Sequence, residues 1–179
     1  LVALTSRHLA LRPPGVDAVT GAALPLAGLT ALQSLEAVRV RAGEVVLVHN
    51  ASGGVGHLAV QIARARGARV IGTSSPRNHD FLRSLGAEPV AYGEGLVDAV
   101  RALAPGGVDA AVDYVGGEAI RQSAQLVTDA GRTASNVDPG AVTAVGGLYC
   151  FVRPDAAQLA LLAGMVAEGA LRVEVAEVF

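Results

Sequence analysis

The sequence predicts an α/β fold, with a parallel sheet of about six strands and helices on both faces. Short apolar runs rich in valine and isoleucine alternate along the chain with stretches of helical spacing. Glycine-containing turns separate the two kinds of segment. This alternation is typical of a right-handed, doubly wound sheet, in which functional residues follow the carboxyl ends of the strands. With 179 residues, of which 51% are hydrophobic, the chain can fill one sizeable core.

Residues 44–66 carry the most informative pattern in the chain. The apolar, β-branched run at 44–50 predicts a strand buried on both faces, and residues 57–66 have helical spacing. Between them lies the sequence Ala-Ser-Gly-Gly-Val-Gly at 51–56. A glycine turn between a strand and a helix is the setting of a dinucleotide site, because the unpaired N–H groups and the positive dipole end of the helix face the phosphates. The order of elements therefore predicts a Rossmann-type site.

Three positions in this turn have distinct physical demands. Ala51 lies at the tight bend, Gly53 where the pyrophosphate would approach the backbone, and Gly56 where the helix would pack on the strand. Alanine in the first position departs from the usual glycine pattern. An ordinary glycine-rich turn that binds nothing is the alternative interpretation.

The end of the second predicted strand, at 68–74, indicates which nucleotide is bound. An acidic residue in this place would hold the ribose 2′-hydroxyl of NAD, but Thr73, Ser74 and Ser75 are found instead, followed by Arg77. Hydroxyl groups and a guanidinium can hydrogen-bond a 2′-phosphate that a carboxylate would repel. NADP(H) is therefore the expected cofactor, with a solvated polar turn as the alternative. The missing acid also argues against an S-adenosylmethionine methyltransferase.

The rest of the chain continues the alternation. We expect helices near 78–85, 96–103, 118–127 and 154–168, and strands near 89–91, 108–114, 131–136 and 144–152. Gly86 follows the first of these helices in the position of a C′ residue. The expected strand order is 3-2-1-4-5-6, with the cofactor across the carboxyl ends.

Residues 18–35 contain no charged residue. Glycine, proline and several polar residues make this stretch too polar for a convincing membrane span, and no signal-peptide pattern precedes it. We expect two packed helices, broken near Pro25.

The sequence contains no evident catalytic constellation or metal site. The four histidines lack the spacing to join Cys150 in a metal site, and His49 ends an apolar strand as a buried, hydrogen-bonded histidine would. Asp109 and Asp113 are expected to be structural carboxylates, and Cys150 to fill the core. A formal net charge of −2 without a basic block gives no indication of nucleic-acid binding, and a single cysteine is typical of a reducing, cytoplasmic setting. Hydride transfer needs no side-chain constellation, since the cofactor carries the chemistry.

Five segments, in order along nearly the whole chain, carry a family resemblance: residues 24–32, 46–56, 85–88, 112–117 and 152–159. Together they resemble the zinc-independent quinone oxidoreductase branch of the medium-chain dehydrogenase/reductase superfamily. The resemblance implies an NADPH-dependent enzyme that reduces quinones or α,β-unsaturated carbonyls.

The resemblance also implies roles for individual residues. Thr30 would lie beside the nicotinamide; Ser52, Gly53, Gly54 and Val55 would hold the pyrophosphate; Ser74, Ser75, Arg77 and Tyr92 would surround the 2′-phosphate; Val115, Gly116 and Asn136 would line the nicotinamide ribose side. Zinc-dependent relatives have a cysteine ligand four residues before the position of Thr30. Leu26 is found there, so no catalytic zinc is expected in this part of the chain.

Domain organisation follows from the same resemblance. Residues 1–179 are expected to form a single NADP(H)-binding Rossmann domain, with 1–14 as the remnant of a linker from a GroES-like barrel, and residues 1–11 resemble the last strand of that barrel. We expect this piece to bind NADPH weakly or moderately and to reduce no substrate efficiently, because relatives place the substrate between the two domains.

Association is expected through the last edge strand, near 144–152. Relatives form dimers by pairing this strand, and Tyr149 and Phe151 would make an open edge favour a partner. A monomer with a solvated edge is the alternative. Two other functions stay open: an enoyl-reductase module of a polyketide or fatty-acid synthase, and a non-catalytic NADP-binding or partner-binding domain.

Overall fold

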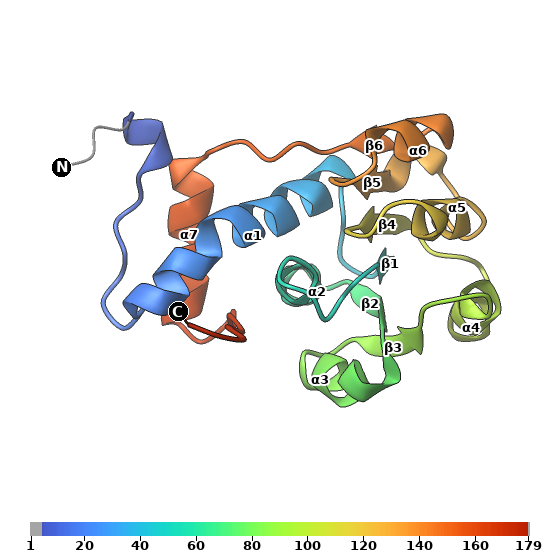
Figure 1. The fold of residues 1–179 in the computed structure, drawn as a ribbon, viewed down its shortest axis with the longest axis horizontal. Helices are drawn as coiled ribbons and strands as arrows, with labels where there is room; N and C mark the ends of the chain where they lie inside the picture. The colour runs from blue at the N-terminus through green and yellow to red at the C-terminus, as the bar shows by residue number, and fades with distance from the viewer. Residues whose placement is uncertain (1–4, 179) are drawn as a thin grey trace.

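Six parallel strands form one sheet in the order β3-β2-β1-β4-β5-β6 in the computed structural model, which describes residues 5–178 (Figure 1). The strands are β1 (Val45–Val48), β2 (Arg69–Ser74), β3 (Glu88–Ala91), β4 (Ala110–Asp113), β5 (Thr133–Ser135) and β6 (Leu148–Tyr149). Every neighbouring pair is parallel. The α/β class, the doubly wound sheet and its strand order are therefore confirmed.

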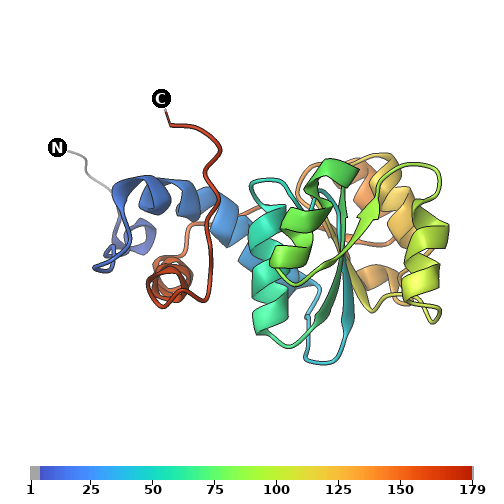
Figure 2. The same cartoon turned by 90° about the horizontal axis from the view of Figure 1, so that it is seen from below.

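Helices cover both faces of the sheet. They are α1 (Ala18–Ala37), α2 (Gly56–Ala65), α3 (His79–Ser84), α4 (Leu96–Leu103), α5 (Glu118–Ala124), α6 (Pro139–Ala144) and α7 (Ala156–Ala167), with 3₁₀ turns η1 (Ser6–His8), η2 (Pro76–Asn78) and η3 (Ala130–Arg132). Figure 2 shows α2 and α3 on one face and α4, α5 and α6 on the other. Helix α7 and the N-terminal part of α1 extend to one side of the sheet, where they pack against each other (Figure 1).

The two faces of the sheet bury separate apolar clusters. Successive side chains of a strand point to opposite faces, so Val46 and Val48 of β1 join the cluster under α1, α2 and α7, whereas Leu47 joins the cluster under α4. All three side chains are fully buried. A continuous apolar run is therefore what a central strand with two covered faces requires.

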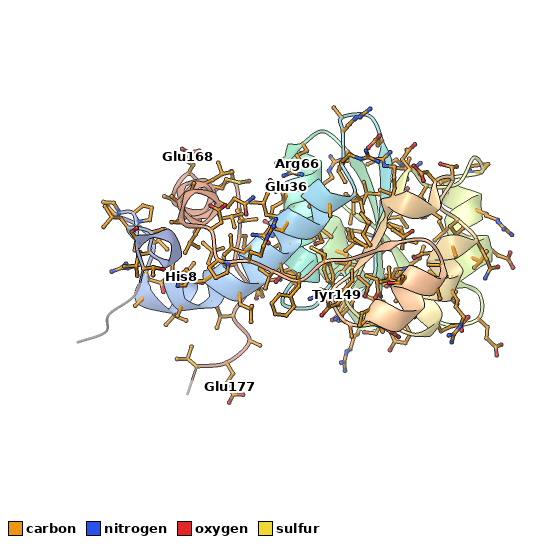
Figure 3. All side chains as sticks on the ribbon, turned by 90° about the horizontal axis from the view of Figure 1, so that it is seen from above. His8, Glu36, Arg66, Tyr149, Glu168 and Glu177 are labelled. Atoms are coloured by element: carbon orange, nitrogen blue, oxygen red, sulfur yellow. The ribbon has the colours of Figure 1, made fainter. Side chains whose placement is uncertain are left out.

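The apolar segment that contains Pro25 forms one helix, so the expected break is wrong. Asp17 caps the helix, since its carboxylate accepts hydrogen bonds from the N–H groups of Val19 and Thr20. A proline inside a helix costs about 3 kcal/mol. Packing of α1 on both α2 and α7 outweighs this cost and keeps the helix continuous. At the α2 contact, Glu36 pairs with Arg66 at 3.4 Å (Figure 3).

Helix α1 is long and apolar enough to cross a membrane by length and composition alone. Half of its most apolar 18-residue window is buried within the protein. A core helix of a soluble protein passes the same test, so the property is weak evidence for a membrane span.

The last strand is much shorter than the expected 144–152. The short helix α6 occupies residues up to Ala144, and only Leu148 and Tyr149 pair with β5. Asp138 begins α6 by accepting a hydrogen bond from the N–H of Ala141 at 2.9 Å, and Pro139 is the first helical residue. This Asp-Pro start signal was overlooked in the sequence.

Residues 1–4 of the segment expected to resemble a barrel strand lie outside the described residues. The following residues form η1 in place of a strand. Their backbone bonds are local, since the N–H of His8 donates to Thr5 and that of Leu9 donates to Ser6. A strand would need a neighbouring strand for these groups.

Candidate nucleotide-binding site

The turn between β1 and α2 is held in shape by close backbone approaches. Asn50 has a positive φ of 52°, and the N–H of Gly53 donates to its carbonyl at 3.0 Å. A Cβ atom on Gly56 would lie 2.1 Å from that same carbonyl oxygen. Glycine is therefore required at 56, where the helix packs against the end of the strand, as the sequence predicts.

Ala51 fits the first position of the turn because the neighbouring strand provides space. Its N–H donates to the carbonyl of Thr73 at 2.9 Å, and the residue is fully buried. A Cβ on Gly72 of β2 would lie 2.8 Å from the Cβ of Ala51. The methyl group that departs from the usual motif is thus accommodated by a glycine on the adjacent strand.

The N-terminus of α2 presents free backbone donors. Among the described residues, no backbone acceptor pairs with the N–H groups of Gly54, Val55 or Gly56. Gly54 is exposed, and no atom would lie within 4 Å of a Cβ there. Unpaired N–H groups at the positive end of a helix form an anion site, so this corner can hold a phosphate.

An open cleft of about 640 Å³ lies along the carboxyl ends of the strands. Its lining is His49, Asn50, Ser52, Thr73, Ser74, Ser75, Arg77, Asn78, Tyr92, Gly93, Tyr114, Val115, Gly116, Glu118, Ala119 and Gln122. Seven residues predicted from the sequence are among them: Ser52, Ser74, Ser75, Arg77, Tyr92, Val115 and Gly116. The structure therefore brings together most of the groups expected to contact the cofactor.

The other predicted residues do not line the cleft. Gly53, Gly54 and Val55 form the turn before α2, and Val55 packs partly against the core. Thr30 is buried in α1, and its hydroxyl donates to the carbonyl of Leu26 at 2.7 Å. Thr30 reaches the cleft only indirectly, since its carbonyl accepts from Ser34, whose hydroxyl lies 2.8 Å from that of Tyr114.

The β2 end of the cleft combines hydroxyl groups with one guanidinium. Ser74 ends the strand, Ser75 follows it, and Arg77 is exposed in η2. Arg77 forms no ion pair with any described residue. Asn78 donates a hydrogen bond to the hydroxyl of Ser52 at 3.0 Å, which joins this end to the glycine turn.

A buried carboxylate shapes the opposite end. Asp113 ends β4 and accepts hydrogen bonds from the N–H groups of Val115 and Gly116 and from the hydroxyl of Ser135. Gly116 and Gly117 both have positive φ, at 87° and 58°. The expectation that Asp113 is structural is confirmed, and its role is to fix the loop that closes the cleft.

Two buried polar side chains form the floor of the cleft. Burial lowers the pKa of His49 to about 4, and its Nε2 atom lies 2.8 Å from the hydroxyl of Ser123. Burial also raises the pKa of Tyr114. Both groups are therefore uncharged at neutral pH, and His49 is the buried, hydrogen-bonded histidine that the sequence predicts.

Sequence reasoning missed Asn78, Glu118 and Gln122. The amide of Gln122 donates to the carbonyl of Gly93 at 2.9 Å, across 29 residues of sequence. Glu118 begins α5 after the short loop that follows β4, so for this residue the position after a strand was a usable signal.

One buried acceptor near the site has no partner. The Oδ1 atom of Asn136, directly after β5, is buried without a hydrogen bond. Buried polar atoms are normally paired, so a ligand donor would relieve this cost. The same loop holds Asp138, which accepts from the N–H of Gly117.

Within residues 5–178, no group of three or more His, Cys, Asp or Glu side chains is placed to hold a metal ion. Cys150 is a free, half-buried thiol, and burial raises its pKa. It packs against the core as expected.

Comparisons with known proteins place this geometry in a family. Residues 54–136 match the family described as zinc-binding dehydrogenase. The solved quinone oxidoreductase of Coxiella burnetii superposes with a TM-score of 0.83 at 36% identity, over 92% of this chain and 54% of that protein.

Proteins related in sequence point to the same group of enzymes. The spectinabilin polyketide synthase system protein NorB of Streptomyces orinoci is 39% identical over 130 residues, which are 70% of this chain and 6% of that protein. The chloroplast envelope quinone oxidoreductase homolog of Arabidopsis thaliana is 45% identical over 94 residues, 48% of this chain and 28% of that protein. The chain thus spans only part of each relative. Together these likenesses support the quinone oxidoreductase and enoyl reductase branch of the medium-chain dehydrogenase/reductase superfamily, a family of nicotinamide-dependent enzymes.

Proposed function

We propose that this chain binds NADP(H) along the carboxyl edge of its sheet and serves an oxidoreductase that transfers hydride to a quinone or an α,β-unsaturated carbonyl compound. The observation that carries the proposal is that unpaired backbone N–H groups at the start of α2 lie beside the cleft at the carboxyl ends of the strands. Gly56, where a side chain would not fit, lets the helix approach β1 at this place. Together these features suit a dinucleotide whose pyrophosphate meets the helix N-terminus.

Preference for the 2′-phosphate is supported by the β2 end of the cleft. Ser74, Ser75 and Arg77 lie there, and Glu118, the one carboxylate in the lining, already pairs with Arg121 at 2.8 Å. A guanidinium without an ion pair can bind a phosphate through two parallel hydrogen bonds. Tyr92, which is 67% exposed, is proposed to help surround the adenosine 2′-phosphate.

At the other end, Val115, Gly116 and Asn136 are proposed to line the nicotinamide ribose side. Thr30 is proposed to support the ring from behind, through Ser34 and Tyr114, because its own side chain is buried. The unpaired Oδ1 atom of Asn136 supports this assignment. When bound, the cofactor would supply the hydride, and this chain would orient it and exclude water. Leu26, at the position of a zinc-ligating cysteine, supports hydride transfer without zinc.

A second candidate function is the enoyl reductase of a polyketide synthase. The likeness to the spectinabilin synthase protein favours it, since the match covers 70% of this chain. The chemistry would be the same reduction of an α,β-unsaturated carbonyl, with the substrate carried on an acyl thioester in place of a free quinone. Steady-state reduction of an enoyl thioester compared with a quinone by the full-length protein separates the two.

We further propose association through β6 and a reducing, cytoplasmic setting. Strand β6 lies at the edge of the sheet, where Tyr149 is 43% exposed (Figure 3). Phe151, two residues further along the chain, is 74% exposed. An uncovered edge with exposed aromatic rings favours pairing with a second copy. The free thiol of Cys150 supports the reducing setting.

Titration with NADPH and NADH, with Arg77→Ala beside the parent, tests the cofactor assignment. A charge-assisted contact contributes about 1.5 to 3 kcal/mol, so the variant should lose roughly tenfold or more in NADPH affinity and keep its NADH affinity. Arg83→Ala is the matched control, because Arg83 pairs with Asp80 on α3 and does not line the cleft. Equal losses for both nucleotides would contradict the role of Arg77.

A further inference from the structure

His57, the second residue of α2, connects the glycine turn with the C-terminal segment. The side chain is 3% exposed, and its two ring nitrogens contact different parts of the chain. Nδ1 lies 2.9 Å from the carbonyl oxygen of Gly53, and Nε2 lies 3.1 Å from the backbone nitrogen of Glu174. The ring therefore connects the glycine turn with Glu174, which lies 117 positions after His57 in the sequence.

These partners fix the tautomer of the ring. The Gly53 carbonyl can only accept a hydrogen bond, so Nδ1 must carry the proton, and the Glu174 N–H can only donate, so Nε2 must accept. Burial lowers the pKa of His57, which favours the neutral ring. Both contacts are satisfied at once only by the neutral Nδ1–H form.

The C-terminal segment is held firmly enough to impose this state. Gln61, one turn further along α2, donates to the carbonyl of Arg172 at 2.9 Å and accepts from its N–H at 2.8 Å. Leu171 is buried in the core, and the Arg172 guanidinium lies 5.8 Å from the centre of the Phe81 ring. The segment 171–174 thus lies along α2 and presents the Glu174 N–H to His57.

Two contacts of His57 with the Gly53 carbonyl set the direction of a proposed ligand donor: the backbone N–H of His57 donates to it at 3.0 Å, and the ring adds the second bond. In a planar trans peptide, the carbonyl and the following N–H point in opposite directions. Because the Gly53 carbonyl is turned toward His57, the N–H of Gly54 is turned away from it. Gly54 is exposed, and its N–H has no backbone acceptor among the described residues.

We propose that His57 is a positioning residue of the nucleotide site, which orients the Gly53–Gly54 peptide toward the pyrophosphate while the segment 171–174 holds its ring in the required tautomer. This inference rests on the proposed function. It adds a residue that touches no nucleotide and a segment far from the motif in sequence.

Two substitutions separate the two contacts. In His57→Asn, the amide nitrogen can occupy the place of Nδ1, so the donor to Gly53 is kept and the acceptor for Glu174 is lost. In His57→Gln, the longer side chain can accept from Glu174, and the donor to Gly53 is lost. We expect His57→Asn to bind NADPH within about twofold of the parent, and His57→Gln to bind roughly tenfold more weakly.

Amide exchange at Glu174 should show the reverse order, with protection kept in His57→Gln and lost in His57→Asn. A general loss of stability would not produce this crossed pattern. Similar NADPH affinities for both variants, or weaker binding by His57→Asn, would overturn the inference. Binding of neither NADPH nor NADH by the parent would instead contradict the proposed function.

A measurement on the unsubstituted protein tests the geometry even if a variant does not fold. Nitrogen chemical shifts of the His57 ring at neutral pH should show a protonated Nδ1 and a bare Nε2. The opposite tautomer, or a doubly protonated ring, would overturn the inference whatever the nucleotide affinity is.

Discussion

Single residues determine the shape of the turn before α2, where the phosphate is proposed to bind, because little free space surrounds them. The Ala51 methyl group is tolerated because the facing residue is Gly72, and the helix can approach β1 because residue 56 has no side chain. Protein interiors are close-packed, so an added methyl group here forces the backbone to move. The methyl group at position 51, where the usual pattern has glycine, is therefore compensated by the missing side chain of Gly72 on the neighbouring strand.

Gly56→Ala is expected to destabilise the protein and to abolish nucleotide binding. The new Cβ would lie 2.1 Å from the Asn50 carbonyl oxygen, and overpacking of this kind costs about 1 to 3 kcal/mol or more. Gly54→Ala is the control for stability, because its Cβ would meet no atom within 4 Å. Urea denaturation measures both variants. Equal free energies of unfolding for the two would contradict the packing argument.

At this scale, the sequence predicted residues that follow a strand and missed those that reach the cleft from elsewhere. Ser74, Ser75 and Arg77 could be identified because they lie at the end of β2 or shortly after it. Asn78 and Gln122 could not, since their contacts with Ser52 and Gly93 depend on how helices pack. The spacing of residues along the chain does not show which distant residues come into contact.

Whole elements show where local propensity is outweighed by packing. Pro25 predicts a break in the first helix, yet contacts with α2 and α7 keep α1 continuous. In the last part of the sheet, the run near 144–152 has the composition of a long strand, but only Leu148 and Tyr149 form β6, and Cys150 adds one further hydrogen bond to Ser135 of β5. Element types were thus largely predictable, whereas breaks and boundaries depended on neighbours.

The edge strand β6 gives a prediction at this scale. Tyr149→Lys with Phe151→Lys should convert a dimer into a monomer, because two charges on the edge disfavour pairing with a second strand. Light scattering measures the mass. Leu11→Lys is the control, since Leu11 is 93% exposed and lies far from β6 in sequence. A monomeric parent, or a dimeric double variant, would contradict association through this edge.

For the molecule as a whole, folding buries two histidines, so the stability of the folded protein depends on pH. Burial lowers the pKa of both His49 and His57 from the ordinary value of 6.5. As the pH falls below that value, the unfolded chain takes up protons that the folded protein does not, so the free energy of unfolding decreases. Glu44 and Glu88 have lowered pKa values and contribute in the same direction only below about pH 4.5.

The free energy of unfolding should therefore fall between about pH 6.5 and pH 4.5, by up to about 1 kcal/mol per pH unit through His49, and His57 should act in the same direction. Urea denaturation at several pH values measures the slope. His49→Gln should reduce it, because the variant lacks the group whose pKa burial lowers most strongly. A variant with the full slope of the parent would show that His49 is not responsible.

The central claim is that one nicotinamide dinucleotide lies across the carboxyl edge of this sheet, with its pyrophosphate at the start of α2. Calorimetric titration of the unmodified chain with NADPH tests it most directly. The account predicts saturable heat with one NADPH bound per chain and weaker binding of NADH. No heat with either nucleotide, from a chain shown to be folded, would contradict it.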